Sequence, residues 1–129
     1  VDFVLLDAPC TGTGTIRRHP DILHRRTPDQ VVRSAKTLDE LLVNAAAMVK
    51  VGGILVFSTC SLQPQEGPDR VDSFLTSNPS FVRAPLGKKF GSEIGAYTTE
   101  AGYLRTLPSC LAEVGGMDGF FAARLKRAF

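Results

Sequence analysis

The sequence predicts an α/β fold in which parallel strands and helices build one sheet. Two short apolar runs, at residues 1–6 and 54–57, have the β-branched and aromatic content of buried strands. A stretch with helical periodicity, residues 28–50, lies between them. A strand, a helix and a second parallel strand connect through a right-handed crossover. The chain of 129 residues suits one core, so we expect a single domain over residues 1–129.

Composition and charge argue against several classes of protein. Hydrophobic residues make up 43% and charged residues 22%, and a net charge of +2 does not by itself indicate a nucleic-acid-binding protein. No apolar run approaches the roughly 20 residues of a membrane span, so we expect no membrane partner. Three cysteines without a Cys-x-x-Cys pair favour a reducing cytoplasm over a disulfide framework. His19 and His24 have no ligand-like neighbours, so we expect no metal site.

The first apolar run, Val1–Leu6, leads into the sequence DAPC at residues 7–10. Proline has no N–H to donate to a sheet, so Pro9 is expected to end the pairing. The following TGTG, residues 11–14, lacks the third glycine of a dinucleotide fingerprint and the Lys-Ser/Thr of a P-loop. A tight turn whose backbone approaches a substrate is therefore favoured over a phosphate cradle.

Four arginines lie in the predicted loop between residues 17 and 26. Taken alone, such a cluster is most simply explained as a solvated surface. The next segment has the signature of a helix start, with Thr27 as a cap, Pro28 in the first turn and Asp29 as an early acid.

Apolar residues after this start recur at three- and four-residue steps and form one stripe. They are Val31, Ala35, Leu38, Leu42, Ala45 and Val49. Lys50 is expected in the last turn, and Gly52 and Gly53 are expected to stop the helix.

The second apolar run, residues 54–57, ends in the polar turn STCS at residues 58–61. Because it is apolar on both faces, we expect helices to cover both sides of it. The carboxyl ends of neighbouring parallel strands meet at one edge of a sheet, where ligands bind. Asp7, Cys10 and Cys60 are therefore expected at one crevice. Cys60 is either a nucleophile there or a half-buried small apolar side chain.

Weaker patterns describe the rest of the chain. A helix is predicted from Gln65 to about Ser77, and a short strand at residues 81–82. Residues 85–102 have no periodicity and are expected to be loop. Residues 103–107 and 120–125 are predicted to form an antiparallel pair of strands, and Cys110 between them is expected to be incidental.

Several of these segments resemble the motifs of the RNA 5-methylcytosine methyltransferases, the family of Sun/Fmu, NOP2 and NSUN proteins and the bacterial 16S rRNA enzyme. They are DAPCTGTG at residues 7–14, RRHPD at 17–21, STCS at 58–61, LRTLP at 104–108 and DGFFAARL at 118–125. The resemblance implies a Rossmann-like, S-adenosylmethionine-dependent methyltransferase sheet, of which this chain would be the carboxyl half, with parallel strands and an antiparallel pair at its C-terminal end.

The family's earlier glycine-rich motif, the acid closing its next strand and its catalytic-site lysine have no counterpart in this sequence. Residue 1 is Val, and the first strand begins at once. We therefore expect a partial catalytic domain from a longer protein, without the cofactor-binding amino half. The family also commonly has Asn after Glu66, whereas this chain has Gly67, so the contact of that asparagine cannot be assumed.

The resemblance implies roles for individual residues in methylation of cytosine C5. Cys60 would add to C6 as the nucleophile, and Cys10 would assist release. The residues themselves leave open which cysteine attacks, and in the DNA enzymes the Pro-Cys cysteine does so. Asp7 would lie where base and cofactor meet, and Asp7 and Pro9 would contact S-adenosylmethionine. An acid that only caps the following turn is the alternative for Asp7.

The resemblance also implies an RNA partner, in the first place ribosomal RNA. Phosphate contacts would come from Arg17, Arg18, His19, Arg25 and Arg26. The target base would have to be unstacked and inserted into the crevice.

Two other functions stay open from the sequence. The chain could be a non-catalytic fragment that does not bind S-adenosylmethionine, or Cys10 and Cys60 could form a thiol redox pair. Without a further partner, the strand at Val1–Leu6 would present an apolar edge, so self-association through this edge is also expected.

Overall fold

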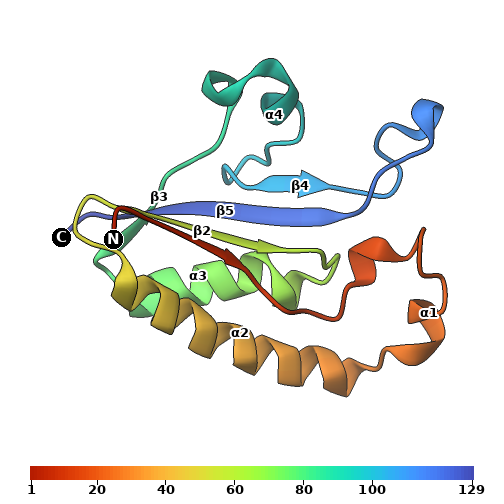
Figure 1. Ribbon diagram of the computed structural model, residues 1–129, viewed down its shortest axis with the longest axis horizontal. Helices are drawn as coiled ribbons and strands as arrows, with labels where there is room; N and C mark the ends of the chain where they lie inside the picture. Colours follow the sequence, from red (N-terminus) through yellow and green to blue (C-terminus); the bar gives the residue numbers. More distant parts are fainter.

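The computed structural model describes residues 1–129 and contains one five-stranded sheet (Figure 1). Its strands are β1 (Phe3–Asp7), β2 (Ile54–Thr59), β3 (Phe81–Arg83), β4 (Leu104–Thr106) and β5 (Phe120–Arg127). The order is β1-β2-β5-β3, and β4 also pairs with β5. β1 and β2 are parallel, whereas β5 is antiparallel to all three of its neighbours. The predicted mixture of parallel strands and an antiparallel C-terminal pair is confirmed, with β5 as the strand that joins the rest.

The long helix α2 (Pro28–Met48) connects β1 to β2 as predicted. Thr27 caps it in a capping box with Gln30, whose side chain accepts the Thr27 N–H at 3.2 Å. The prediction that Lys50 lies in the last turn is wrong, because the helix ends at Met48. The backbone of Val49 is extended, and its side chain is 1% exposed and lies in the core. The helix therefore ends before this residue. The Lys50 N–H then donates to the carbonyl of residue 1 at 2.9 Å.

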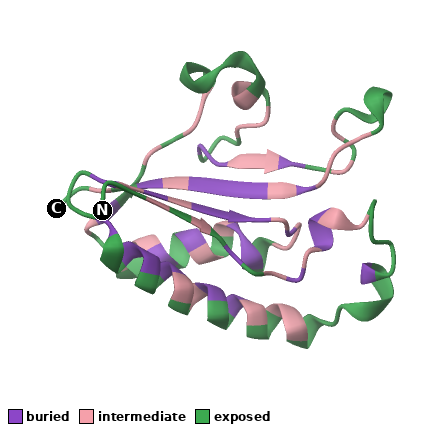
Figure 2. Ribbon diagram, in the orientation of Figure 1, coloured by how far each residue is buried: buried purple, intermediate pink, exposed green.

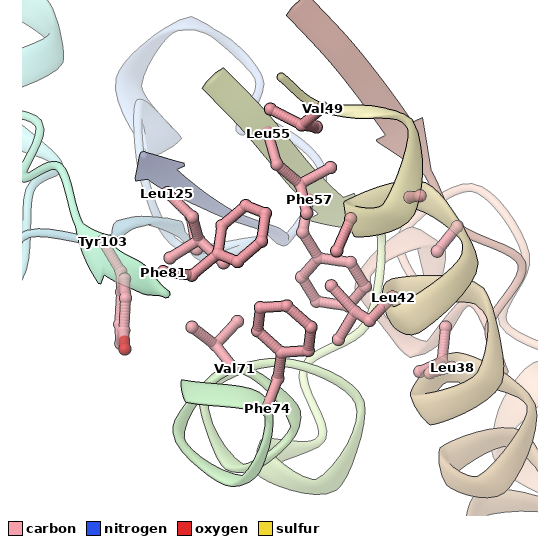
Figure 3. Packing of buried hydrophobic residues seen from close by; sticks show 14 of the residues in the cluster. Leu38, Leu42, Val49, Leu55, Phe57, Val71, Phe74, Phe81, Tyr103 and Leu125 are labelled. Atoms are coloured by element: carbon pink, nitrogen blue, oxygen red, sulfur yellow. The ribbon is translucent and has the colours of Figure 1, made fainter. Parts of the chain in front are cut away.

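Helices α2 and α3 (Pro68–Ser77) pack on the same face of the sheet, and their buried side chains build the core (Figures 2 and 3). Its largest fully buried apolar side chains are Phe57, Phe121, Leu38, Leu42, Leu55, Leu125, Val49 and Val71. The expectation that helices cover both faces of β2 is wrong for this chain, since Ile54 and Val56 on the other face are only half-buried. An apolar run shows that a strand can be buried, but not which element covers it.

Several single turns of helix were not predicted. Helix α1 (Ile22–Arg25) lies in the arginine-rich loop, and residues 85–102 contain a 3₁₀ turn at Lys88–Phe90 and helix α4 (Ser92–Ala96). Such turns are too short to show a 3.6-residue period in the sequence. The predicted helix from Gln65 begins instead at Pro68, after a separate 3₁₀ turn at Pro64–Glu66, because proline suits the first helical position. None of the helices is both long enough and apolar enough to cross a membrane.

Strand β1 lies at the edge of the sheet and pairs with β2 alone. The side chains of Phe3 and Leu5 on this strand are 57% and 61% exposed. An apolar, unpaired edge is a template for pairing with another chain, so we expect the chain to self-associate. Sedimentation velocity should show a mass that rises with concentration, and Leu5→Lys should reduce it. Val32→Lys, on the exposed face of α2, is the matched control, and a concentration-independent monomer would contradict the prediction.

Candidate two-cysteine active site

The parallel pairing of β1 and β2 brings two thiols together at one edge of the sheet. The register pairs Asp7 with Ser58, and Cys10 and Cys60 follow shortly after. Their Sγ atoms lie 3.6 Å apart, a distance that allows a hydrogen bond between the two thiols, although 50 residues separate them in sequence. The two loops therefore form one site, at the end of the sheet opposite the two termini (Figure 1).

Gly14 lies between the backbones of the Cys60 turn and of the segment before β5. Its N–H donates to the carbonyl of Cys60 at 2.8 Å, and its carbonyl accepts from the N–H of Gly119 at 2.7 Å. A Cβ on Gly14 would lie 2.0 Å from the carbonyl oxygen of Gly119 and 2.7 Å from that of Cys60. The tight turn predicted at residues 11–14 is present, but its backbone closely approaches the protein's own chain. At Gly14 the backbone therefore contacts the protein itself, where the sequence predicted an approach to substrate.

The surroundings of Cys10 disfavour its thiolate. Burial, followed by the neighbouring Cys60 sulfur, raises the pKa of Cys10 from 9.0 to about 12. Cys10 therefore keeps its proton at neutral pH. Since either sulfur can donate across the 3.6 Å contact, a protonated Cys10 can donate to Cys60.

Asp7 lies at the carboxyl end of β1 and is exposed. Its Oδ1 accepts a hydrogen bond from the hydroxyl of Ser58 at 3.1 Å, across the β1–β2 pair. Its other carboxylate oxygen has no hydrogen-bond partner in the structure. Pro9 is exposed next to it, so both residues face solvent at this edge.

Arg17 and Arg18 both bind one carboxylate, that of Asp118, in the segment before β5. Arg17 Nε lies 3.1 Å from Oδ1, and Arg18 Nη2 lies 2.6 Å from Oδ2. The hydrogen bond from Arg18 is the main cause of the lowered pKa of Asp118. These two arginines therefore tie the loop after β1 to the start of β5, and their charge is partly offset.

The other predicted RNA contacts lie further along the same loop. The Arg26 Nε–H donates to the carbonyl of Thr11 at 2.8 Å, which supports the turn after Cys10. Arg25 forms a surface pair with Asp21 at 3.0 Å, and His19 is exposed. The structure thus places Arg26 at the thiol site and leaves His19 and Arg25 on the surface.

A pocket of about 270 Å³ adjoins Cys10. Residues 9–11 line one side, and Arg26, Gln30 and Arg33 line the other. The lining residues include no carboxylate, so the pocket is electropositive. The structure contains no cluster of three or more histidine, cysteine or acidic side chains that could hold a metal ion.

Two residues near the thiols were not among the predicted site residues. Glu66 is fully buried between the two cysteine loops, although a glutamate in a polar turn gives no signal of burial in a sequence. Arg105 donates from Nη1 to the carbonyl of Ser61 at 2.7 Å, and its guanidinium lies 5.1 Å from the ring centroid of Phe121. A Cβ on Gly67 would lie 3.1 Å from that ring and 3.3 Å from the Arg105 guanidinium. A Cβ at this position would therefore require both neighbours to shift by a few tenths of an ångström.

Known proteins are similar to this chain in sequence. Residues 1–126 match the family model described as 16S rRNA methyltransferase RsmB/F. Ribosomal RNA small subunit methyltransferase B of Thermus thermophilus is 39% identical over 127 residues, which cover 96% of this chain and 29% of that protein. Ribosomal RNA small subunit methyltransferase F of Aliivibrio salmonicida is 35% identical over 127 residues, 98% of this chain and 26% of that protein.

Solved structures show the same fold. A methyltransferase homologue from Pyrococcus horikoshii superposes with a TM-score of 0.69 at 32% identity and covers 98% of this chain and 39% of its own. NSun6 from Pyrococcus horikoshii, solved with SFG, superposes with a TM-score of 0.73 over 97% of this chain and 29% of its own. At 24% identity this second likeness supports the fold alone.

The chain spans between a quarter and a third of the length of the two related methyltransferases, 29% and 26%. The match nevertheless runs through both cysteine loops and on to β5, because it covers residues 1–126. The chain therefore belongs to the RsmB/F family of 16S rRNA methyltransferases.

Proposed function

We propose that the protein to which this chain contributes methylates C5 of cytosine in 16S rRNA, and that the chain is part of its catalytic domain. The observation that carries the proposal is the 3.6 Å contact between Cys10 and Cys60 at the carboxyl ends of two parallel strands. Family membership supplies the reaction class, since the related proteins are named as methyltransferases of small-subunit ribosomal RNA. Cytosine C5 is a poor nucleophile, and addition of a thiolate to C6 is a covalent route that activates it.

In this proposal Cys60 is the nucleophile. Its sulfur adds to C6 of the ring, which turns C5 into an enamine carbon that can accept a methyl group. Loss of the C5 proton to solvent water, and breakage of the S–C6 bond with its electron pair left on the Cys60 sulfur, then restore the aromatic ring. The raised pKa of Cys10, about 12, supports this assignment over the reverse, because Cys10 carries too little thiolate to attack.

Cys10 assists the release of the product in this scheme. As the S–C6 bond breaks, negative charge develops on the Cys60 sulfur. A protonated Cys10 at 3.6 Å can donate its hydrogen to that sulfur and so stabilise the leaving thiolate.

S-adenosylmethionine is the proposed cofactor, and it supplies the methyl group when bound. The residues at the β1 edge fit it, because Asp7 is exposed and keeps one carboxylate oxygen without a partner, which suits an amino group. Pro9 beside it completes the part of the cofactor site that we assign to this chain.

RNA contacts are proposed for Arg17, Arg18, His19, Arg25 and Arg26. The side chains of Arg17 and Arg18 remain 40% and 52% exposed beside Asp118, so each guanidinium keeps donors for phosphate. Arg26 lines the electropositive pocket beside Cys10 and so lies nearest to a base held by the thiols.

Replacing Cys10 by alanine in the whole protein should trap it covalently on its RNA. Addition by Cys60 is still available, but elimination loses its hydrogen donor, so the adduct accumulates. A slower-migrating protein–RNA band in a denaturing gel measures this. The matched control is the Cys10→Ala/Cys60→Ala double variant, which should give no band, and a Cys10→Ala protein that never forms an adduct would argue against the division of roles.

A thiol redox pair is the second candidate function, and the short sulfur–sulfur distance favours it. A disulfide needs about 2.05 Å between the sulfurs, which a small movement from 3.6 Å would reach. Under our proposal both thiols stay reduced in a glutathione buffer poised like the cytoplasm. Mass spectrometry after thiol labelling checks this, and a disulfide between Cys10 and Cys60 that persists in this buffer would favour the redox function instead.

A further inference from the structure

Glu66 is a fully buried carboxylate that the mechanism above does not use. It is 0% exposed, and none of the salt bridges in the structure includes it. Burying an acid without a positively charged partner is costly unless hydrogen bonds replace its water. The groups that surround Glu66 therefore indicate its role.

Three donors converge on the Glu66 carboxylate, and they come from the two cysteine loops. Thr11 donates its backbone N–H to Oε1 at 2.8 Å and its hydroxyl to Oε2 at 2.5 Å. Ser61 donates its hydroxyl to the same Oε2 at 2.5 Å. Such lengths are typical of strong hydroxyl–carboxylate bonds. One side chain thus bridges two loops that are 50 residues apart.

The two bridged residues directly follow the two cysteines, Thr11 after Cys10 and Ser61 after Cys60. We propose that Glu66 is a positioning residue that holds the Cys10 and Cys60 loops in the arrangement in which their thiols meet. The inference rests on the proposed function only in requiring that the two thiols act as a pair.

The surroundings of the bridge are buried. Thr11, Thr59 and Ser61 are at most 3% exposed. The Thr59 hydroxyl donates to the main-chain carbonyl of Glu66 at 3.1 Å, and the Gln63 N–H donates to the Ser61 hydroxyl at 3.0 Å. A buried network whose members are all satisfied holds one geometry, and loss of one member leaves the others unpaired. Glu66 lies at the centre of this network.

The carboxylate also acts on Cys10 through its charge. Burial and the Cys60 sulfur are the main causes of the raised pKa of Cys10, and Glu66 acts in the same direction. Removing the charge should lower that pKa, and loosening of the loop should lower it further by admitting water. Both effects of losing Glu66 should therefore lower the pKa of Cys10.

The test is Glu66→Gln in the whole protein, with the rate of alkylation of Cys10 and of Cys60 by iodoacetamide measured against pH and assigned by peptide mass spectrometry. Glutamine keeps the shape but offers one acceptor where the two hydroxyls and the N–H need two. We expect the Cys10 profile to move to lower pH, with alkylation at pH 8 about tenfold faster, the effect of one pKa unit. Glu40→Gln on the exposed side of α2 is the matched control and should leave the profile unchanged.

A second pair of variants covers the case in which Glu66→Gln does not fold. Thr11→Val removes one hydroxyl from the bridge while keeping its shape, and Thr11→Ser restores the hydroxyl. The valine variant should show the shifted Cys10 profile, and the serine variant should return it towards that of the original chain. A folded Glu66→Gln or Thr11→Val chain with an unchanged profile overturns the proposal, and so does a failure of both to fold, which would show a role in folding alone.

These measurements use neither RNA nor S-adenosylmethionine. A shifted Cys10 profile in a whole protein that does not methylate RNA would therefore count against the proposed function and leave the bridge intact. An unchanged profile in a protein that does methylate RNA would count against the bridge alone.

Discussion

A Cys60→Ala variant of the whole protein is expected to lose methylation of its RNA. Without the sulfur no bond forms at C6, so C5 stays a poor nucleophile. Removal of a covalent nucleophile in other enzymes lowers the rate by roughly 10⁴-fold or more, and we expect a loss of that order. Transfer of a labelled methyl group from S-adenosylmethionine to 16S rRNA measures it.

Cys110→Ala is the control for this variant. Cys110 lies in the loop between β4 and β5, where its sulfur accepts only a 3.4 Å contact from the N–H of Leu107. Its replacement should leave the methylation rate near that of the original protein. A Cys60→Ala protein that methylates at the normal rate would exclude Cys60 as the nucleophile and leave Cys10 as the candidate for that role.

Replacing Gly14 by alanine is expected to disrupt the two-cysteine site and to destabilise the fold. The added Cβ would lie 2.0 Å from a backbone oxygen of Gly119, and backbone cannot rotate away as a side chain can. Relief of this overlap breaks the hydrogen bonds of Gly14 to Cys60 and Gly119. Together these effects should lower the free energy of unfolding by on the order of 3–5 kcal/mol.

Urea unfolding followed by circular dichroism measures the effect of Gly14→Ala. Gly87→Ala is the matched control, because a Cβ at Gly87 meets no atom within 4 Å. That substitution should change the free energy of unfolding by no more than about 0.5 kcal/mol. Equal stability of the two variants would show that the turn around Gly14 is not held as the structure shows.

The central part of the fold could be predicted because its signals are local and periodic. The apolar run at residues 54–57 and the stripe from Val31 to Val49 each show their period within one segment. Parallel pairing of β1 and β2 then follows from the helix between them, and the closeness of Cys10 and Cys60 follows from the pairing. Neither the pairing of the strands nor the closeness of the two cysteines depends on side-chain contacts.

The supporting contacts of the site could not be predicted, because they depend on residues far apart in sequence. Asp118 binds Arg17 and Arg18 across about 100 residues, which no local pattern shows. Glu66 has no local sequence signal of burial, and its role as a buried bridge depends on Thr11 from the first loop. The single turns of α1 and α4 are likewise set by the loops that carry them, not by a period of their own.

Strand β5 has a consequence for how this sheet is made on the ribosome. It pairs with β2, β3 and β4, yet it is the last of these five strands in chain order. Until residues 120–127 have left the exit tunnel, β3 and β4 have no partner in the sheet and one side of β2 stays open. A nascent chain stalled before Phe120 therefore exposes unpaired strand edges. Intermediates of this kind are prone to aggregation and are bound by chaperones.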